Sequence, residues 1–378
     1  MKLKVGTDFS GIGAPEQALK NLGIDFESVF ACEIDKYARQ SYSAIHDEPK
    51  RFYNDITKRD HTEVEQLDLY VAGFPCQSFS IAGQRKGFDE ARGTLFFDVA
   101  EFIRINQPKC FILENVKGLL SHDKGRTYQT ITDILTNGGG TLNGQISIDL
   151  FDDGLGYHVY AQVLNTKNYG IPQNRERIFI VGFKDFREFS FPIKEQLQLR
   201  LRDMLQDNPN AKYYLSDKAL EYLRRAKEDR DNENINIDNG SGTSSTITRN
   251  YYKGVHNRGE TYIKLDEKYY LSNKMIEGFS QHNVNHQNKG TGFIWKPKDG
   301  DDVANSLRAN AALCPTDNSL QCAERIRRLT PLECWRLQDF PDNAFFKAAD
   351  VCSDTRLYQQ AGNSITVAVI EKIIQKIY

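Results

Sequence analysis

The chain has 378 residues, enough for one large domain or two ordinary ones, and its 39% hydrophobic and 26% charged residues are typical of a globular protein. No apolar run approaches the roughly 20 residues that a membrane-spanning helix needs. The formal net charge of −2 gives no overall attraction to nucleic acid, so any contact with DNA has to come from local basic patches.

The cysteines indicate reduced thiols. Seven cysteines are scattered singly along the chain, without a CxxC pair, and their total is odd. This pattern favours neither a disulfide framework nor a zinc ribbon. The first residues lead directly into a strand pattern, with no signal peptide. We therefore expect a cytoplasmic protein.

The first half of the chain alternates strand-like and helix-like segments at the spacing of βαβ units, which predicts an α/β fold with a mostly parallel sheet. Helix patterns are expected at residues 15–22, 35–45, 93–105 and around Tyr128. Strand patterns are expected at residues 2–9, 27–34, just before Asp55, and at 67–74, 109–116, 156–165 and 177–183.

The composition changes along the second half. Residues 137–154 contain several glycines and predict a hairpin or a loop insertion. A charged helix is expected at 216–231, followed by a flexible polar loop at 231–246. Residues 364–377 are apolar enough for a strand and a helix that return to the main core.

A cysteine follows a proline at the end of the apolar stretch 67–74, in the sequence GFPCQSFS. A free cysteine is more often an inert core residue. Here, however, Pro75 forces Phe74 out of helical geometry and ends any strand ladder, which places Cys76 on a tight turn. In a parallel α/β sheet, ligands bind where the strands end.

The turn DFSGIGAP joins the first strand to the first helix. Taken alone, its glycines indicate a tight turn as readily as a nucleotide site. Glu33, about 20 residues further on at the tip of the second strand, is placed like an acid that binds ribose hydroxyls. Glu16 stands where the dinucleotide fingerprint has its third glycine, so a cofactor with adenosine but no pyrophosphate fits better than NAD.

Two further groups lie at strand ends. Glu114 closes the apolar run FILENV, where poor solvation should raise its pKa, although for this residue alone a carboxylate satisfied by local backbone donors is the commoner case. With Cys76 it forms a candidate pair of nucleophile and acid. Arg175 and Arg177 alternate along a strand and should point to one face of it, although solvated surface charges are the commoner case.

Read in order, nine segments resemble the motifs of the cytosine-5 DNA methyltransferases, as found in bacteria and phages and in restriction-modification systems. They are DFSGIG, ACEID, NDI, GFPCQSFS, RGTLFFDVA, LENV, QNRERIFIVG, RRLTPLECWRLQDFP and AGNSITVAV. The resemblance runs from Asp8 to Ile370. It implies a Rossmann-like methyltransferase domain at residues 1–185, completed by 355–378, and a smaller irregular target-recognition domain at 186–354.

The resemblance also implies a mechanism. Carbon 5 of cytosine is too weak a nucleophile to take a methyl group directly, so the Cys76 thiolate would first add to carbon 6. Glu114 would hydrogen-bond or protonate N3 of the ring. Arg175 would hold the cytosine carbonyl and steady the thiolate, with Arg177 as its companion. No side chain identifies itself as the base that removes the proton from carbon 5.

The implied cofactor is S-adenosylmethionine, and the residues that match its pocket come from both ends of the chain. They are Phe9, Gly11, Gly13, Glu33, Ile34, Asp55, Ile56, Pro75, Leu95, Asn363 and Ile365.

The implied partner is double-stranded DNA, from which the target base must be flipped out. Residues 80–93 would form a mobile lid. The residues expected to contact DNA are Gln77, Ser80, Gln84, Arg85, Arg249, Tyr251, Lys253 and Arg327. His282 and His286 lack a third ligand, so no metal is expected. We expect a monomer, either an orphan enzyme or one accompanied by a cognate restriction endonuclease.

Two alternatives remain open at this point. One branch of the family modifies tRNA, but its Cys-Phe-Thr tripeptide is absent from this sequence, and the long variable stretch suits duplex DNA better. A catalytically silent DNA-binding relative is the second alternative, against which the presence of Cys76, Glu114 and Arg175 argues.

Overall fold

The computed structural model describes residues 2–75, 95–136, 153–207 and 326–378, and shorter stretches between them. Those stretches are 141–142, 146–147, 209–216, 218–219, 221–222, 236–238, 241–253, 261–264, 281 and 283–284. The described residues do not include Cys76, the expected lid at 80–93, or the two histidines that were considered as metal ligands, His282 and His286.

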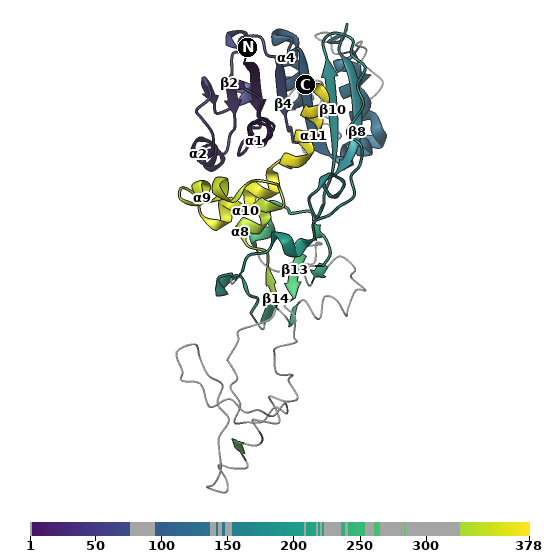
Figure 1. Cartoon of the computed structure of the whole chain (residues 1–378). Coiled ribbons are helices and arrows are strands. Elements are labelled where there is room, and N and C mark those ends of the chain that lie inside the picture. The colour runs from purple at the N-terminus through teal and green to yellow at the C-terminus, as the bar shows by residue number, and fades with distance from the viewer. Residues whose placement is uncertain are drawn as a thin grey trace.

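A seven-stranded sheet forms the body of the protein, in the order β3-β2-β1-β4-β5-β10-β8 (Figure 1). The first five strands in this order are parallel, and β10 runs antiparallel to both of its neighbours. The strands confirm the predicted ones: β1 Leu3–Asp8, β2 Phe26–Cys32, β3 Arg51–Tyr53, β4 Leu69–Ala72, β5 Cys110–Val116, β8 His158–Asn165 and β10 Glu176–Phe183.

Helices cover both faces of the sheet. On one face, α1 (Ala14–Asn21) lies against α11 (Val367–Ile377), which brings the two ends of the chain together (Figure 1). On the other face lie α4 (Leu95–Asn106) and α5 (Arg126–Leu135). Successive residues of β4 belong alternately to the two buried clusters, which explains its unbroken apolar sequence.

The order of the strands locates the site. From β1 the chain builds β2 and β3 on one side, then crosses to place β4 and β5 on the other. At such a reversal the connections leave in opposite directions and open a crevice at the carboxyl ends of the strands. Phe9, Glu33 and Gly73 directly follow β1, β2 and β4, and Glu114 lies on β5, two positions before its end.

Four helices and several short strands complete the described part of the chain. Helix α9 (Asp342–Ala349) packs on α2 (Lys36–Ile45), and α10 (Asp354–Asn363) packs on α8 (Pro331–Arg336). The short strands are β6 Thr141–Leu142, β7 Ile146–Ser147, β9 Gln173–Asn174, β11 Asn236–Asp238, β12 Ser244–Ser245, β13 Thr261–Lys264 and β14 Ile326–Arg328. The antiparallel pair β6–β7 confirms the predicted hairpin.

Two sequence predictions were wrong. Residues 364–366 form no strand, because the apolar side chains of 367–377 recur at helical spacing and the helix begins at once, with Thr366 at its N-cap. The stretch 231–246 is not entirely loop, since it contains β11 and β12, which pair with β13 and β9. Of the expected helix at 216–231, residues 218–219 and 221–222 are described and helical.

No helix in the described part of the chain is both long and apolar enough to cross a membrane.

A buried ion pair braces the end of β1. The Arg59 guanidinium donates two hydrogen bonds of 2.7 Å to the carboxylate of Asp8, and neither side chain is exposed to solvent. The hydroxyl of Tyr70 donates to the same carboxylate at 2.7 Å. The guanidinium also lies 4.3 Å from the ring centroid of Phe30 and 4.6 Å from that of Phe102. All charged groups of this cluster are therefore compensated.

We expect Arg59→Met to lower the free energy of unfolding by about 3–5 kcal/mol, because it leaves the Asp8 carboxylate buried and uncompensated. Chemical denaturation measures the change. Lys2→Met is the matched control, since the Lys2–Asp25 pair has side chains 61% and 72% exposed and contributes little. Equal denaturation midpoints for Arg59→Met and the wild type would contradict this account.

Candidate active site

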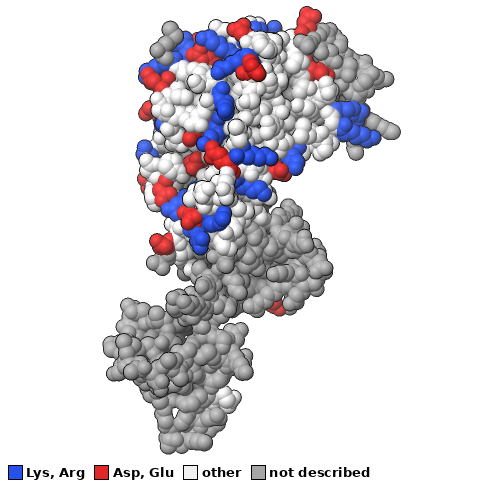
Figure 2. Space-filling view, turned by 45° about the vertical axis from the view of Figure 1, so that its right-hand side comes forward, with Lys and Arg blue, Asp and Glu red and all other residues white. Residues whose placement is uncertain are grey.

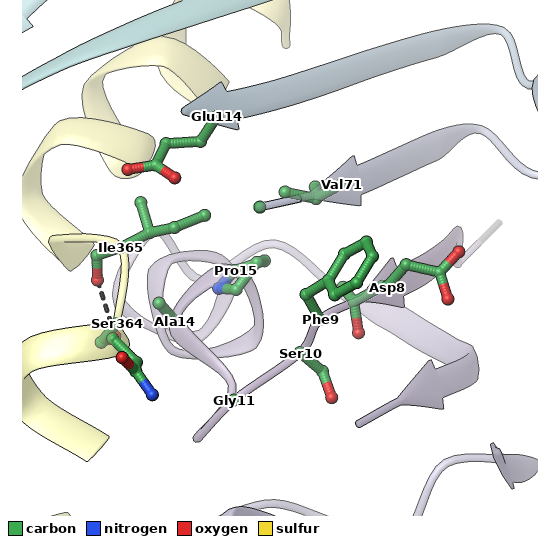
Figure 3. Close-up of a pocket in the computed structure, with 13 residues that line it drawn as sticks. Asp8, Phe9, Ser10, Gly11, Ala14, Pro15, Val71, Glu114, Ser364 and Ile365 are labelled. Atoms are coloured by element: carbon green, nitrogen blue, oxygen red, sulfur yellow. Dashed lines mark hydrogen bonds between the residues drawn. The ribbon is translucent and has the colours of Figure 1, made fainter. Parts of the chain in front are cut away.

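A cavity of about 710 Å³ opens at the carboxyl ends of the parallel strands. This volume lies within the range of small-molecule sites. A recess of about 30 Å³ lies beside it, lined by the turn after β1 and by the segment before α11 (Figure 3). Phe9, Gly11, Glu114 and Asn363 line both spaces, so the cavity and its recess form one site.

The turn after β1 forms the floor of this site. Phe9 and Gly11 both have a φ of 55°, and the amide of Gly11 donates to Oε2 of Glu33 at 3.0 Å. Gly13, at φ 80°, lines neither space, and a Cβ built on it would lie 2.3 Å from Nε2 of His46. Gly13 therefore serves the turn and its packing rather than the cavity wall.

Glu33 follows β2 and lies in the cavity wall. Its Oε1 accepts a hydrogen bond of 2.8 Å from the amide of Asp35. Burial raises the pKa of Glu33, and the hydrogen bonds from the two amides oppose this effect. The next side chain, Ile34, is 75% exposed. The loop after β2 thus presents a carboxylate and a bare apolar surface side by side.

The residues expected around an adenine ring lie at the neighbouring strand end but line neither space. Asp55 caps the short helix η1 (Ile56–Lys58) by accepting from the amide of Thr57 at 3.0 Å. Ile56 is buried, and Phe9 and Leu95 pack against the cluster that contains it. Through Phe9, these apolar residues adjoin the floor of the site.

Glu114 and Arg177 lie on the adjacent antiparallel strands β5 and β10, and their side chains contact each other. Arg177 Nε lies 3.1 Å from Oε1 of Glu114, and the two side chains are 18% and 11% exposed. Burial raises the pKa of Glu114, although the charges of Arg177 and Arg175 act in the opposite direction. The pair therefore offers a hydrogen-bonding carboxyl group and a cation at one point of the cavity.

The chain that leads to Cys76 is fixed beside this pair. The side-chain amide of Asn115 donates to the carbonyl of Phe74 at 2.9 Å. Pro75 lines the cavity, and a Cβ on Gly73 would lie 3.6 Å from Oε2 of Glu114. The last described residues before Cys76 therefore lie next to Glu114. Sequence reasoning missed this tether, although Asn115 is adjacent to the predicted acid.

Arg175 is placed differently from its neighbour. Its guanidinium donates to the backbone carbonyls of Ile247, Gly362 and Ser364, at 3.2, 3.3 and 2.8 Å, and the residue is only 3% exposed. Burial and the charge of Arg177 lower its pKa, but a guanidinium remains charged at neutral pH. The two arginines thus lie close together but have different partners. Arg177 contacts Glu114, whereas Arg175 joins three segments of the chain.

The carboxyl-terminal segment reaches the site as expected. Asn363 ends α10 and lines both spaces, and Ile365 faces Glu114 across the recess in Figure 3. The hydroxyl of Ser364 donates to the carbonyl of Ile365 at 2.8 Å.

The residues expected to contact DNA differ in where the structure places them. Arg249 is exposed and lines the cavity. The prediction that Tyr251 contacts DNA was wrong. Tyr251 is 2% exposed, its hydroxyl accepts from the amide of Leu329 at 2.9 Å, and its ring packs on Tyr358. It is therefore a core residue that cannot reach a duplex. Only the backbone of Lys253 and Arg327 is described. Gln77, Ser80, Gln84 and Arg85 lie outside the described residues.

Metal ligands do not gather in the described part of the chain, where no group of three or more His, Cys, Asp or Glu side chains could hold an ion.

A sequence model of the family described as C-5 cytosine-specific DNA methylase matches residues 7–378 of this chain. The chain belongs to this family. The orphan methyltransferase M.SPRI of Bacillus phage SPR is 34% identical to this DNA methylase, covering 100% of this chain and 97% of its own length. The type II methyltransferase M.HpaII of Haemophilus parainfluenzae is 35% identical, over 98% of this chain and 88% of its own.

Solved structures support the fold of this DNA methylase. The crystal structure of the S. pombe Dnmt2 methyltransferase matches with a TM-score of 0.65 and 17% sequence identity, covering 99% of this chain and 97% of that one. At this identity the match supports the Rossmann-like fold, and the activity follows from the family and the relatives above.

Because the two arginines have different partners, we expect their removal to have different effects. Arg177→Met should reduce methyl transfer to DNA by about 100-fold or more. It should change the melting temperature little, because burial already raises the pKa of Glu114 and the carboxyl group can take up a proton when its partner is removed. Arg175→Met should lower the free energy of unfolding by about 2–4 kcal/mol, since three buried carbonyls lose a charged donor. Parallel measurement of activity and denaturant unfolding separates the effects, and a similar loss of stability in both variants would contradict the assignment.

Proposed function

We propose that this DNA methylase transfers a methyl group from S-adenosylmethionine to carbon 5 of a cytosine that is flipped out of double-stranded DNA. The observation that carries the proposal is the Glu114–Arg177 pair on β5 and β10, in the cavity at the strand ends and beside the tethered chain that leads to Cys76. A carboxyl group that can protonate and a fixed cation suit the polar edge of a pyrimidine ring.

In the proposed reaction, the sulfur of the Cys76 thiolate forms a bond to carbon 6 of the ring. The displaced electron pair moves toward N3 and the carbonyl, where Glu114 supplies a hydrogen bond or a proton. Carbon 5 becomes the nucleophile and takes the methyl group from the donor, leaving the neutral thioether S-adenosylhomocysteine. Loss of the proton from carbon 5 then returns electrons to the ring, the bond between sulfur and carbon 6 breaks, and the thiolate is regenerated.

The two arginines exchange the roles that the sequence suggested. We assign the contact with the cytosine carbonyl to Arg177, because its guanidinium lies beside Glu114 in the cavity. Arg175 is assigned a positioning role, because its donors are directed at backbone carbonyls of the segments around it.

The chemistry of the recess and of the adjoining cavity wall fits S-adenosylmethionine, which supplies an electrophilic methyl group when it is bound. Phe9, Gly11, Asn363 and Ile365 would hold its methionine part, Glu33 its ribose and Ile34 its adenine, with Asp55, Ile56, Pro75 and Leu95 nearby. No residue that lines the recess is Lys or Arg. Such a lining suits a cofactor that carries a positive sulfonium and no phosphate.

We also propose how the chain divides into a catalytic unit and a target-recognition region. Residues 1–185 with 355–378 form the catalytic unit, and target recognition lies within 186–354. The packing of α9 on α2 supports moving α8 and α9 to the catalytic side of this boundary. We further propose that the protein acts as a cytoplasmic monomer on specific sequences, either as an orphan enzyme or beside a cognate restriction endonuclease.

Labelled methyl transfer tests the proposal. We expect the wild type to methylate duplex DNA but not tRNA, and Cys76→Ser to lose at least about 1,000-fold of this activity, because a hydroxyl at this position is a far weaker nucleophile than a thiolate. Cofactor and DNA binding should persist in the variant. Near-normal turnover by Cys76→Ser, or methylation of tRNA in place of DNA, would contradict the proposal.

A further inference from the structure

Tyr37 lies at the border of the large cavity and carries two cations. It is the second residue of α2 and is half-buried. The guanidinium carbon of Arg356, from α10, lies 4.1 Å from the centroid of its ring. The ammonium group of Lys36 lies 4.9 Å from the same centroid. Two helices that are far apart in the sequence thus bring positive charges to one aromatic ring.

Neither cation has a carboxylate partner among the described residues. The guanidinium of Arg356 donates to the neutral Oε1 of Gln359 at 3.0 Å. The acids of the adjacent loop are engaged elsewhere: Glu33 accepts from the amides of Gly11 and Asp35, and Asp35 accepts from those of Tyr37 and Ala38. Contact with an aromatic face is worth about 0.5–1 kcal/mol per cation and does not neutralise their mutual repulsion.

Arg356 and Tyr37 line the same cavity that holds the catalytic pair, and Lys36 adjoins it through the ring of Tyr37. Arg356, Gln359 and Asn363 recur on α10 at the spacing of one helix face, and all three line the cavity. Next to Asn363, a Cβ on Gly362 would lie 2.3 Å from the amide nitrogen of Arg249. The segment that carries the exposed Arg249 is therefore packed directly against the same helix.

Because positive and negative residues are nearly balanced over the whole chain, a local group of cations without carboxylate partners is a distinctive feature. Figure 2 shows Lys and Arg side chains interspersed with Asp and Glu over the described part of the face, as the net charge of −2 suggests. Other cations of the described residues are neutralised by a carboxylate, as in the pairs of Lys117 with Glu176 and of Arg336 with Asp342. Lys36 and Arg356 differ in this respect, and they meet at Tyr37 in the wall of the cavity.

We propose that Lys36 and Arg356, held on the ring of Tyr37, bind a backbone phosphate of the DNA substrate beside the flipped nucleotide. A guanidinium stacked on a ring keeps its planar fork of donors free for a phosphate. The recess assigned to the methionine part of the cofactor has no such cations in its lining, and S-adenosylmethionine carries no phosphate. A phosphate contact carries no sequence information, so this site positions the strand and does not select the target.

Salt dependence of binding tests the proposal on the full-length protein. Each phosphate contact adds about 0.9 to the slope of log affinity against log salt concentration. We expect Arg356→Gln and Lys36→Gln each to lower the slope by up to about 0.9, equally for target and unrelated duplexes. Between 50 and 200 mM salt, a full contact corresponds to a roughly 3.5-fold smaller loss of affinity. Lys2→Gln, at the opposite end of β1, should leave the slope unchanged.

A second variant separates binding from packing. Arg356→Lys keeps the charge but loses the planar stack, so it should restore most of the salt slope even if the melting temperature falls. A slope that is unchanged in both glutamine variants would overturn the proposal. So would a loss of S-adenosylmethionine affinity without a loss of DNA affinity, which would assign the cations to the cofactor. Methyl transfer at low salt and saturating DNA reports separately on the catalytic function.

Discussion

The hydrogen bonds of Arg175 are the constraint on which the site depends. One guanidinium joins the start of β10, the segment at Ile247 and the carbonyls of Gly362 and Ser364. These segments are far apart in the sequence, and each contributes a wall of the cavity. This junction acts together with the pairing of β12 with β9 and the packing of α11 on α1, which hold the same segments from further away. A buried, always charged donor suits this task, because each carbonyl that it satisfies would otherwise be buried without a partner.

The same junction places two positive charges beside one carboxyl group. Burial raises the pKa of Glu114, whereas Arg177 and Arg175 lower it. The local field thus favours negative charge on whatever enters, and the developing negative charge of a cytosine ring attacked at carbon 6 would be stabilised there without reorganisation of the protein. The order of the strands determines where this happens, because Gly73, Glu114 and Phe9 follow or end neighbouring parallel strands.

The sequence predicted the sheet and most of the site because its functional residues stand at the ends of apolar strands. It could not distinguish Arg175 from Arg177, since alternation along a strand gives both residues the same direction. Their partners are distant in the sequence: those of Arg175 lie 72, 187 and 189 positions away, and Glu114 lies 63 positions from Arg177. The burial of Tyr251 was missed for a related reason: an aromatic residue within a basic segment suits a DNA surface as well as a core. The Asp8–Arg59 brace joins residues 51 positions apart and has no local pattern. The absent strand before α11 shows that a short apolar run does not by itself separate strand from helix.

The central claim is that a covalent bond between Cys76 and carbon 6 activates carbon 5, and a duplex containing 5-fluorocytosine at the target position tests it most directly. Fluorine cannot leave as a proton does, so the reaction should stop after methyl transfer. The account predicts a denaturation-resistant complex whose mass equals that of the protein, the DNA and one methyl group, with the link mapped to the peptide that contains Cys76. Full methylation of normal duplexes together with no trapped species on the fluorinated duplex would contradict it.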